Sequence, residues 1–164
     1  MSLEINHRRS ASSGTVGWER FGTPDQATSA ELLWYFFPGD VEILSHGTSL
    51  ASEVGSVPAL HFVAAMVGAR DELASGTGSR YSYDFTEADQ SISFQRRGGD
   101  VRIETSFSTN VLTIPLDEFS SGVRLFARRE IEDLGREYPA LLAHPLMLDL
   151  KRRCGGDERV ERPL

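Results

Sequence analysis

The clearest pattern in the chain is an alternation of apolar and polar side chains over residues 80–114. It occurs in three successive runs, around Tyr83, Phe94 and Ile103, and a fourth apolar stretch follows at residues 111–114. Successive side chains of a β-strand point to opposite faces of the sheet, so a repeat of two is typical of a strand with one buried face. The segment therefore predicts a four-stranded β-meander.

One turn of this meander is specified by glycine. Gly98 and Gly99 separate the second and third runs. Glycine readily adopts the positive φ angles of a tight hairpin turn, and a two-residue turn sets the pairing of the strands on either side of it. The predicted pairs are Arg97 with Asp100, Phe94 with Ile103, and Ile92 with Thr105.

The two faces of the predicted meander differ in chemistry. A preceding loop at residues 86–90 places Phe85 beside Ile92 and Tyr83 beside Phe94, so the aromatic side chains gather on one face. The other face is polar, and its hairpin tip is acidic. We expect the polar face and the tip to bind a partner through Asp84, Glu87, Asp89, Ser93, Gln95, Arg102 and Glu104.

An aromatic run precedes the meander at residues 32–37 and stops at Pro38-Gly39-Asp40, which is a turn signal. The run predicts a strand, and residues 41–44 predict a second strand that returns beside it. In this hairpin Trp34 pairs with Ile43.

Three helices are predicted. Residues 57–74 are apolar nearly all round, which favours burial on more than one side. Residues 115–137 carry one apolar stripe and acidic side chains in the first turn, as expected of an amphipathic helix. Residues 140–153 predict a last helix, with Pro145 in a kink or an early turn.

These elements together predict an α+β fold. We expect one antiparallel β-sheet of five to seven strands, covered on one face by two or three α-helices. Residues 1–30 are expected to be flexible with a short strand at 16–21, residues 31–153 to form the single α+β domain, and residues 154–164 to be a disordered tail. The size of the chain, 164 residues, is suited to one domain.

Charge limits the kind of partner. Residues 31–150 hold 18 acidic and nine basic side chains, a balance of −9. Such a surface repels nucleic acid and attracts basic proteins. No apolar run is long enough to span a membrane, and the first residues lack a secretory signal pattern, so we expect a cytoplasmic protein without a membrane partner. The oligomeric state stays open.

Candidate catalytic chemistry is sparse. The single cysteine, Cys154, is expected to be exposed in a polar tail, and the four histidines lack metal-ligand spacing, so no metal or cofactor is predicted. No nucleophile motif or phosphate-binding loop is present, which favours a non-catalytic binding module. The alternative is an enzyme or small-ligand binder with a pocket between sheet and helices, lined by Trp34, His61 and Tyr83.

The order of three segments resembles a known group of proteins. Phe36–Val41 is followed by a buried helix, by Tyr83–Glu87 and Phe94–Gly98, and then by an amphipathic helix. Over residues 31–138 this succession resembles small bacterial domains grouped with the immunity proteins of toxin systems, and the region after Tyr138 departs from it. The resemblance implies a protein partner, plausibly in an immunity-type or regulatory role, but no individual site residue.

Overall fold

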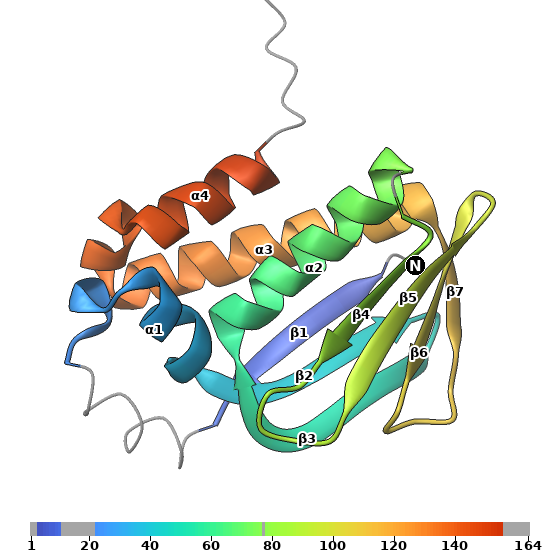
Figure 1. The fold of residues 1–164 in the computed structure, drawn as a ribbon, viewed down its shortest axis with the longest axis horizontal. Coiled ribbons are helices and arrows are strands. Elements are labelled where there is room, and N and C mark those ends of the chain that lie inside the picture. Colours follow the sequence, from blue (N-terminus) through green and yellow to red (C-terminus); the bar gives the residue numbers. More distant parts are fainter. Residues whose placement is uncertain (1–2, 11–21, 77, 156–164) are drawn as a thin grey trace, which may run out of the picture.

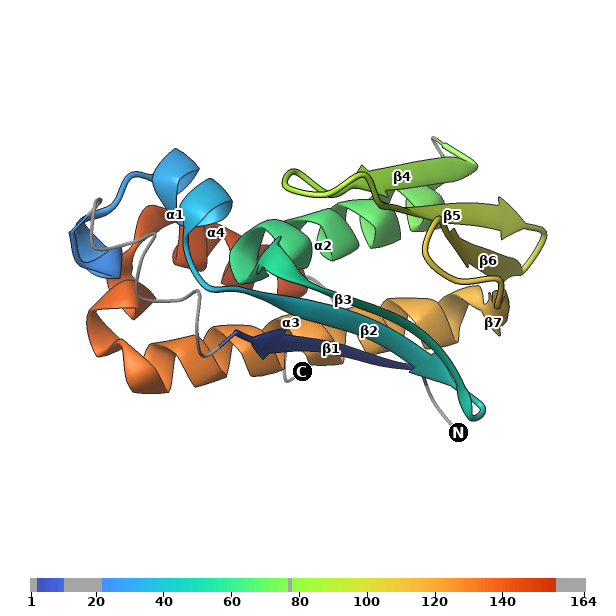
Figure 2. The same cartoon turned by 90° about the horizontal axis from the view of Figure 1, so that it is seen from below.

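A computed structural model describes residues 3–10, 22–76 and 78–155 of the chain (Figures 1 and 2). The fold is α+β, as predicted. The prediction of one sheet was wrong, because the strands in these residues form two antiparallel sheets, one of three strands and one of four. Helices α2 (Ala59–Ser75) and α3 (Leu116–Glu137) contact strands of both sheets, so the two sheets share one core.

The three-stranded sheet contains β1 (Glu4–Arg9), β2 (Pro38–Ser45) and β3 (Thr48–Pro58), in that order. The turn between β2 and β3 consists of His46 and Gly47, which have φ angles of 49° and 77°. Two successive residues with positive φ form the tight turn that matches the twist of a hairpin. β3 was not predicted from the sequence.

β1 lies in the N-terminal segment, where the sequence predicted a strand only at residues 16–21. Ile5 is buried and pairs with Ile43 of β2. α3 lies beside the strand (Figure 2), and Arg129 donates from Nη2 to the backbone oxygen of Ile5 and to Oδ1 of Asn6. The sequence did not predict β1, because Ile5 is its one fully buried side chain and a single apolar position cannot show the alternation of a strand. The strand predicted at 16–21 lies outside the described residues.

The aromatic run at 32–37 is mostly helical, which corrects the predicted strand. α1 (Ser29–Tyr35) begins with a capping box in which the Glu31 N–H donates to Thr28 Oγ1 (3.1 Å) and the Thr28 N–H donates to the Glu31 carboxylate (2.8 Å). These two bonds satisfy backbone donors that a helix start otherwise leaves unpaired. Ile43 consequently pairs with strands on both sides and not with Trp34.

The four-stranded sheet confirms the predicted meander. Its strands follow one another in chain order: β4 (Arg80–Asp84), β5 (Ser91–Arg97), β6 (Asp100–Thr105) and β7 (Leu112–Pro115). All three pairs predicted around the glycine turn are present. The β4–β5 register was predicted two residues out, because Tyr83 pairs with Ile92 and Tyr81 with Phe94. The loop begins at Phe85, whose N–H donates to the Gln90 oxygen (2.9 Å).

The shared core lies around α2. Phe62 of α2 packs edge-on against Phe126 of α3, with ring centroids 5.4 Å apart, and also against Tyr83 of β4, at 5.7 Å. Burial of α2 on more than one side is confirmed. Its buried residues are Ala59, Leu60, Phe62, Val63, Ala65, Met66, Val67, Ala69 and Leu73.

The C-terminal elements pack on α3. The predicted helix 140–153 is divided into a 3-10 helix, η3 (Pro139–Ala143), and α4 (Pro145–Cys154), with Pro145 in the first turn. A second 3-10 helix, η2 (Pro24–Gln26), precedes α1 and contacts η3. Cys154 is 2% exposed in the last turn of α4, which corrects its expected position in an exposed tail.

Core truncation tests the assignment of the two sheet faces. Phe94 is fully buried in β5, and the neighbouring Ser93 lies on the opposite face. Phe94→Ala should lower the free energy of unfolding by about 3–5 kcal/mol, the usual effect of removing a buried aromatic ring. Ser93→Ala should change it little. Equal losses in urea unfolding of the two variants would contradict the assigned faces.

The contribution of β1 can be measured in the same way. Ile5→Ala should lower the free energy of unfolding by about 2–5 kcal/mol, because its side chain is buried between β2 and α3. Glu4→Ala is the matched control, since Glu4 is exposed on the same strand. If Ile5→Ala is as stable as Glu4→Ala, β1 does not contribute to the folded state.

Candidate functional site

The outward side chains of β4, β5 and β6 form one continuous surface. The strand register sets them in rows, so that Ser82, Ser93 and Glu104 lie side by side and Gln95 lies beside Arg102. The helices contact the sheet through the opposite, apolar side chains. We name this surface the polar sheet face. It consists of Arg80, Ser82, Asp84, Ser91, Ser93, Gln95, Arg102 and Glu104.

The structure brings five of the seven predicted partner-binding residues onto this face and places the other two beside it. Asp84 ends β4, while Glu87 and Asp89 are exposed on the loop at residues 85–90. This loop is attached to its neighbours: Ser52 of β3 donates to the Gln90 side chain, and the Ser91 N–H donates to Ser106 Oγ (2.9 Å). The acidic tip is therefore held in place relative to the sheet.

Charge is unevenly distributed over the face. Arg102 donates from Nε to Glu104 (2.7 Å), so Glu104 is largely neutralised. Within the described residues no arginine or lysine pairs with Asp84, Glu87 or Asp89. Arg80 and Arg97 lie toward the other end of the strands. The face thus has an acidic end at the tip, while the end near the glycine turn carries two arginines and the Asp100 carboxylate, which lies opposite Arg97.

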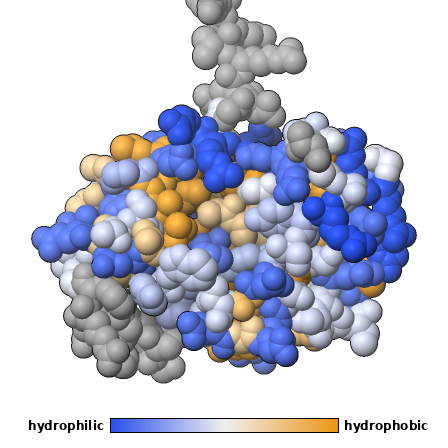
Figure 3. All heavy atoms as spheres, viewed as in Figure 1, coloured by the Kyte–Doolittle hydropathy of each residue, from blue (hydrophilic) through white to orange (hydrophobic). Residues whose placement is uncertain are grey.

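Apolar and polar surface are separated on the molecule. Figure 3 shows hydrophilic side chains over the region of the four-stranded sheet and apolar side chains gathered between α1 and α4. Exposed apolar residues on those helices include Trp34 at 45% and Leu148 at 53%. The polar sheet face therefore differs in character from the surface around the C-terminal helices.

Trp34, His61 and Tyr83, proposed from the sequence as pocket residues, come together from α1, α2 and β4. The Trp34 and His61 rings lie 4.5 Å apart, and His61 Nδ1 and the Tyr83 hydroxyl are 2.9 Å apart in a hydrogen bond. Tyr83 is 4% exposed. The Trp34 and His61 rings and the His61 and Tyr83 rings contact one another, with centroids 4.5 and 5.5 Å apart. The arrangement is a packed cluster.

Burial changes the proton affinity of this cluster. It lowers the pKa of His61 below 6.5, because the charged imidazolium loses its hydration beside Trp34. It raises the pKa of Tyr83 for the corresponding reason, since the phenolate is the charged form. Both groups are therefore neutral at pH 7, which suits a packed cluster at the edge of the core.

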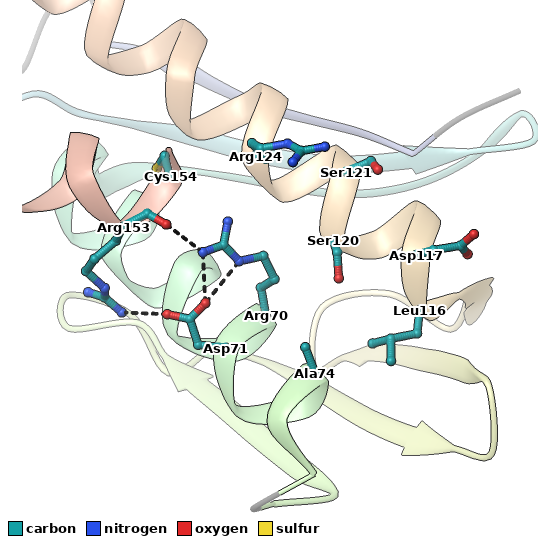
Figure 4. A pocket seen from close by; sticks show the side chains of 10 residues that line it. All are labelled: Arg70, Asp71, Ala74, Leu116, Asp117, Ser120, Ser121, Arg124, Arg153 and Cys154. Atoms are coloured by element: carbon teal, nitrogen blue, oxygen red, sulfur yellow. Dashed lines mark hydrogen bonds and ion pairs between the residues drawn. The ribbon is translucent and has the colours of Figure 1, made fainter. Parts of the chain in front are cut away.

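A hollow of about 610 Å³ lies between α2, α3 and the end of α4 (Figure 4). We name it the helical cleft. Its polar lining includes Arg70, Asp71, Asp117, Ser120, Ser121, Arg124 and Arg153. None of these residues was predicted as a site, because three helices far apart in the chain contribute them. The one local indication in the sequence was the spacing of Ser120 and Arg124, which are four residues apart and therefore share one face of a helix.

The described part of the chain contains neither a cluster of metal-binding side chains nor a helix that could cross a membrane. Histidine, cysteine, aspartate and glutamate side chains nowhere gather there in threes to hold a metal ion. None of the helices in residues 3–10, 22–76 and 78–155 has both the length and the apolar character to cross a bilayer.

Comparison with known protein families, with curated proteins and with solved structures finds no match for this chain.

The lowered pKa of His61 has a direct consequence for stability. The folded state binds the proton less readily than the unfolded state, so stability should be complete above pH 6.5 and should fall as the pH drops below it. NMR titration of the His61 ring should give a pKa below 6.5. In urea unfolding, His61→Gln should lose less stability between pH 7.5 and pH 5.5 than the unchanged protein.

His7 is the internal comparison for this experiment. Its pKa is also lowered by burial, so it should retain part of the pH dependence in the His61→Gln variant. A His61 pKa at or above 6.5 would mean that Trp34 does not shield the ring from water.

Proposed function

We propose that this protein is a non-catalytic binding module that docks a basic protein partner on the polar sheet face. The observation that carries the proposal is the acidic tip: three exposed carboxylates at one end of an uncovered sheet face, with no cation paired to them in the described residues. A cytoplasmic location belongs to the same proposal.

Rigidity supports this choice of surface. The face is backed by the buried side chains Ile92, Phe94 and Ile103, the tip loop is bonded to β3 through Gln90, and Ser91 beside it is bonded to Ser106, which follows β6. A surface that is already ordered loses little conformational freedom when a partner binds. The affinity of such a surface depends on complementarity more than on folding during binding.

Charge on the face supports a particular kind of partner. The carboxylates at the tip have no cationic partner in the described residues and attract a basic segment, whereas the other end attracts it less, because Arg80 and Arg97 lie there beside Asp100. Long-range attraction of this kind accelerates association and orients the partner, while contributing less to the final affinity. The partner should therefore bind in one direction along the strands.

The resemblance to immunity proteins suggests a toxin as one partner of this kind, and a regulatory role fits the same surface. A small-ligand or enzymatic function centred on Trp34, His61 and Tyr83 has less support. Their side chains fill the space between α1, α2 and β4 with mutual contacts. A ligand would first have to displace Trp34.

Charge reversal at the tip tests the proposal. A partner is first recovered from cell extract with the full chain, and its association rate is then measured at several salt concentrations. Asp84→Lys, Glu87→Lys and Asp89→Lys together should slow association severalfold at about 0.1 M salt and much less at about 1 M, where screening is nearly complete. The melting temperature should stay nearly constant, because exposed charges contribute little to stability.

The control variant changes net charge equally at a distance from the face. Glu4, Asp25 and Glu132 are exposed carboxylates on β1, η2 and α3, and their joint replacement by lysine should slow association far less. Equal slowing in both triple variants would show that net charge and not the tip attracts the partner. An unchanged rate in the tip variant would rule out this docking surface.

A further inference from the structure

We propose that the helical cleft binds a small molecule through an anionic phosphate or carboxylate group, and that Arg70 is the residue that receives this group. The cleft lies between helices, apart from the polar sheet face, so this binding site goes beyond the proposed protein docking.

Arg70 is held in position before any ligand arrives. Its side chain is 15% exposed. Nε and Nη2 donate to Asp71 Oδ1 at 3.0 and 2.8 Å, and Nη2 also donates to the backbone oxygen of Arg153 at 2.9 Å. One edge of the guanidinium is therefore tied down, while Nη1 points into the hollow (Figure 4). A preorganised guanidinium binds an oxyanion with little further loss of freedom.

The charge around the hollow favours an anion. Asp71 is shared between two cations, because its second oxygen lies 3.4 Å from Arg153. Arg124 adds a third guanidinium from α3, on the wall opposite Arg70. The Asp117 carboxylate at the rim points away from the hollow (Figure 4). Three arginines and two carboxylates therefore line the cleft, so its lining is net positive in a chain whose net charge is −7.

The size of the hollow indicates more than a free ion. Its volume of about 610 Å³ lies within the range of roughly 300–1,000 Å³ that is usual for small-molecule sites. The Ser120 hydroxyl faces the same space, and Ala74 and Leu116 supply apolar lining (Figure 4). An anionic group at Arg70 leaves room for a hydroxylated body along the α3 wall, with hydrogen bonds to serine.

The test is an NMR titration of the full chain with inorganic phosphate at constant ionic strength, and with acetate in a second arm. Saturable shifts of backbone amides should appear around Arg70, Ser120 and Arg124, and the tighter of the two probes identifies the class of anion. Arg70→Gln should weaken the tighter binding at least tenfold. Arg80→Gln, which removes an exposed arginine from the polar sheet face, should leave it unchanged.

A second variant separates loss of the site from loss of the fold, because Arg70 also joins α2 to α4. Ser120→Phe places a ring in the hollow and leaves the guanidiniums intact, so it should abolish the shifts while the spectrum of the four-stranded sheet is unchanged. The proposal fails if neither probe saturates, if both variants bind the probe as the unchanged protein does, or if the shifts spread evenly over surface arginines.

Discussion

The burial of α2 on several sides is the constraint on which the rest of the structure depends. A helix that is apolar nearly all round cannot be covered by a single sheet or a single helix. Here β3, β4 and β5 contact it from two sheets, and α1, α3 and α4 contact it from the helical side. α2 and β4 approach each other closely at Gly68, where a Cβ atom would lie 3.1 Å from the Tyr81 hydroxyl. The functional surfaces are what this packing leaves outside: one face of each sheet and the grooves between helices.

The parts of the fold that could be predicted are those with a complete local pattern. Alternation predicted three strands of the meander and an apolar stretch predicted the fourth, and the glycine pair predicted the β5–β6 register. The division into two sheets could not be predicted, because it depends on β1 and β3. β1 has one fully buried residue, and β3 contains exposed Ala51 and Glu53 beside a glycine at 55. In α1 the aromatic side chains suggested a strand, while the capping box of Thr28 and Glu31 determined a helix.

Prediction of the candidate sites followed the same rule. The polar sheet face could be predicted from the sequence, because the two-residue repeat of a β-strand decides which side chains share a face. The sequence predicted that Trp34, His61 and Tyr83 lie together. It did so although the predicted β4–β5 register was wrong and the segment that contains Trp34 is a helix, not the predicted strand. The helical cleft could not be predicted from the sequence. Arg70 and Ser120 are about 50 positions apart in the chain and Arg124 and Arg153 about 30, and they meet only after the helices pack. Charged side chains on helices ordinarily face water, so neither Arg70 on α2 nor Arg124 on α3 indicated a binding site in the sequence.

The bond from Arg129 to the backbone of Ile5 joins residues 124 positions apart. During synthesis at about 5–20 residues per second, β1 leaves the ribosome roughly 6–25 s before the helix that covers it. β2 and β3 can pair early through their two-residue turn, but the contact of β1 with α3 must wait until α3 has been made. β1 is therefore among the last of the described strands to receive all its contacts, and in this interval the backbone oxygen of Ile5, on the outer strand of its sheet, lacks the guanidinium that binds it in the finished protein.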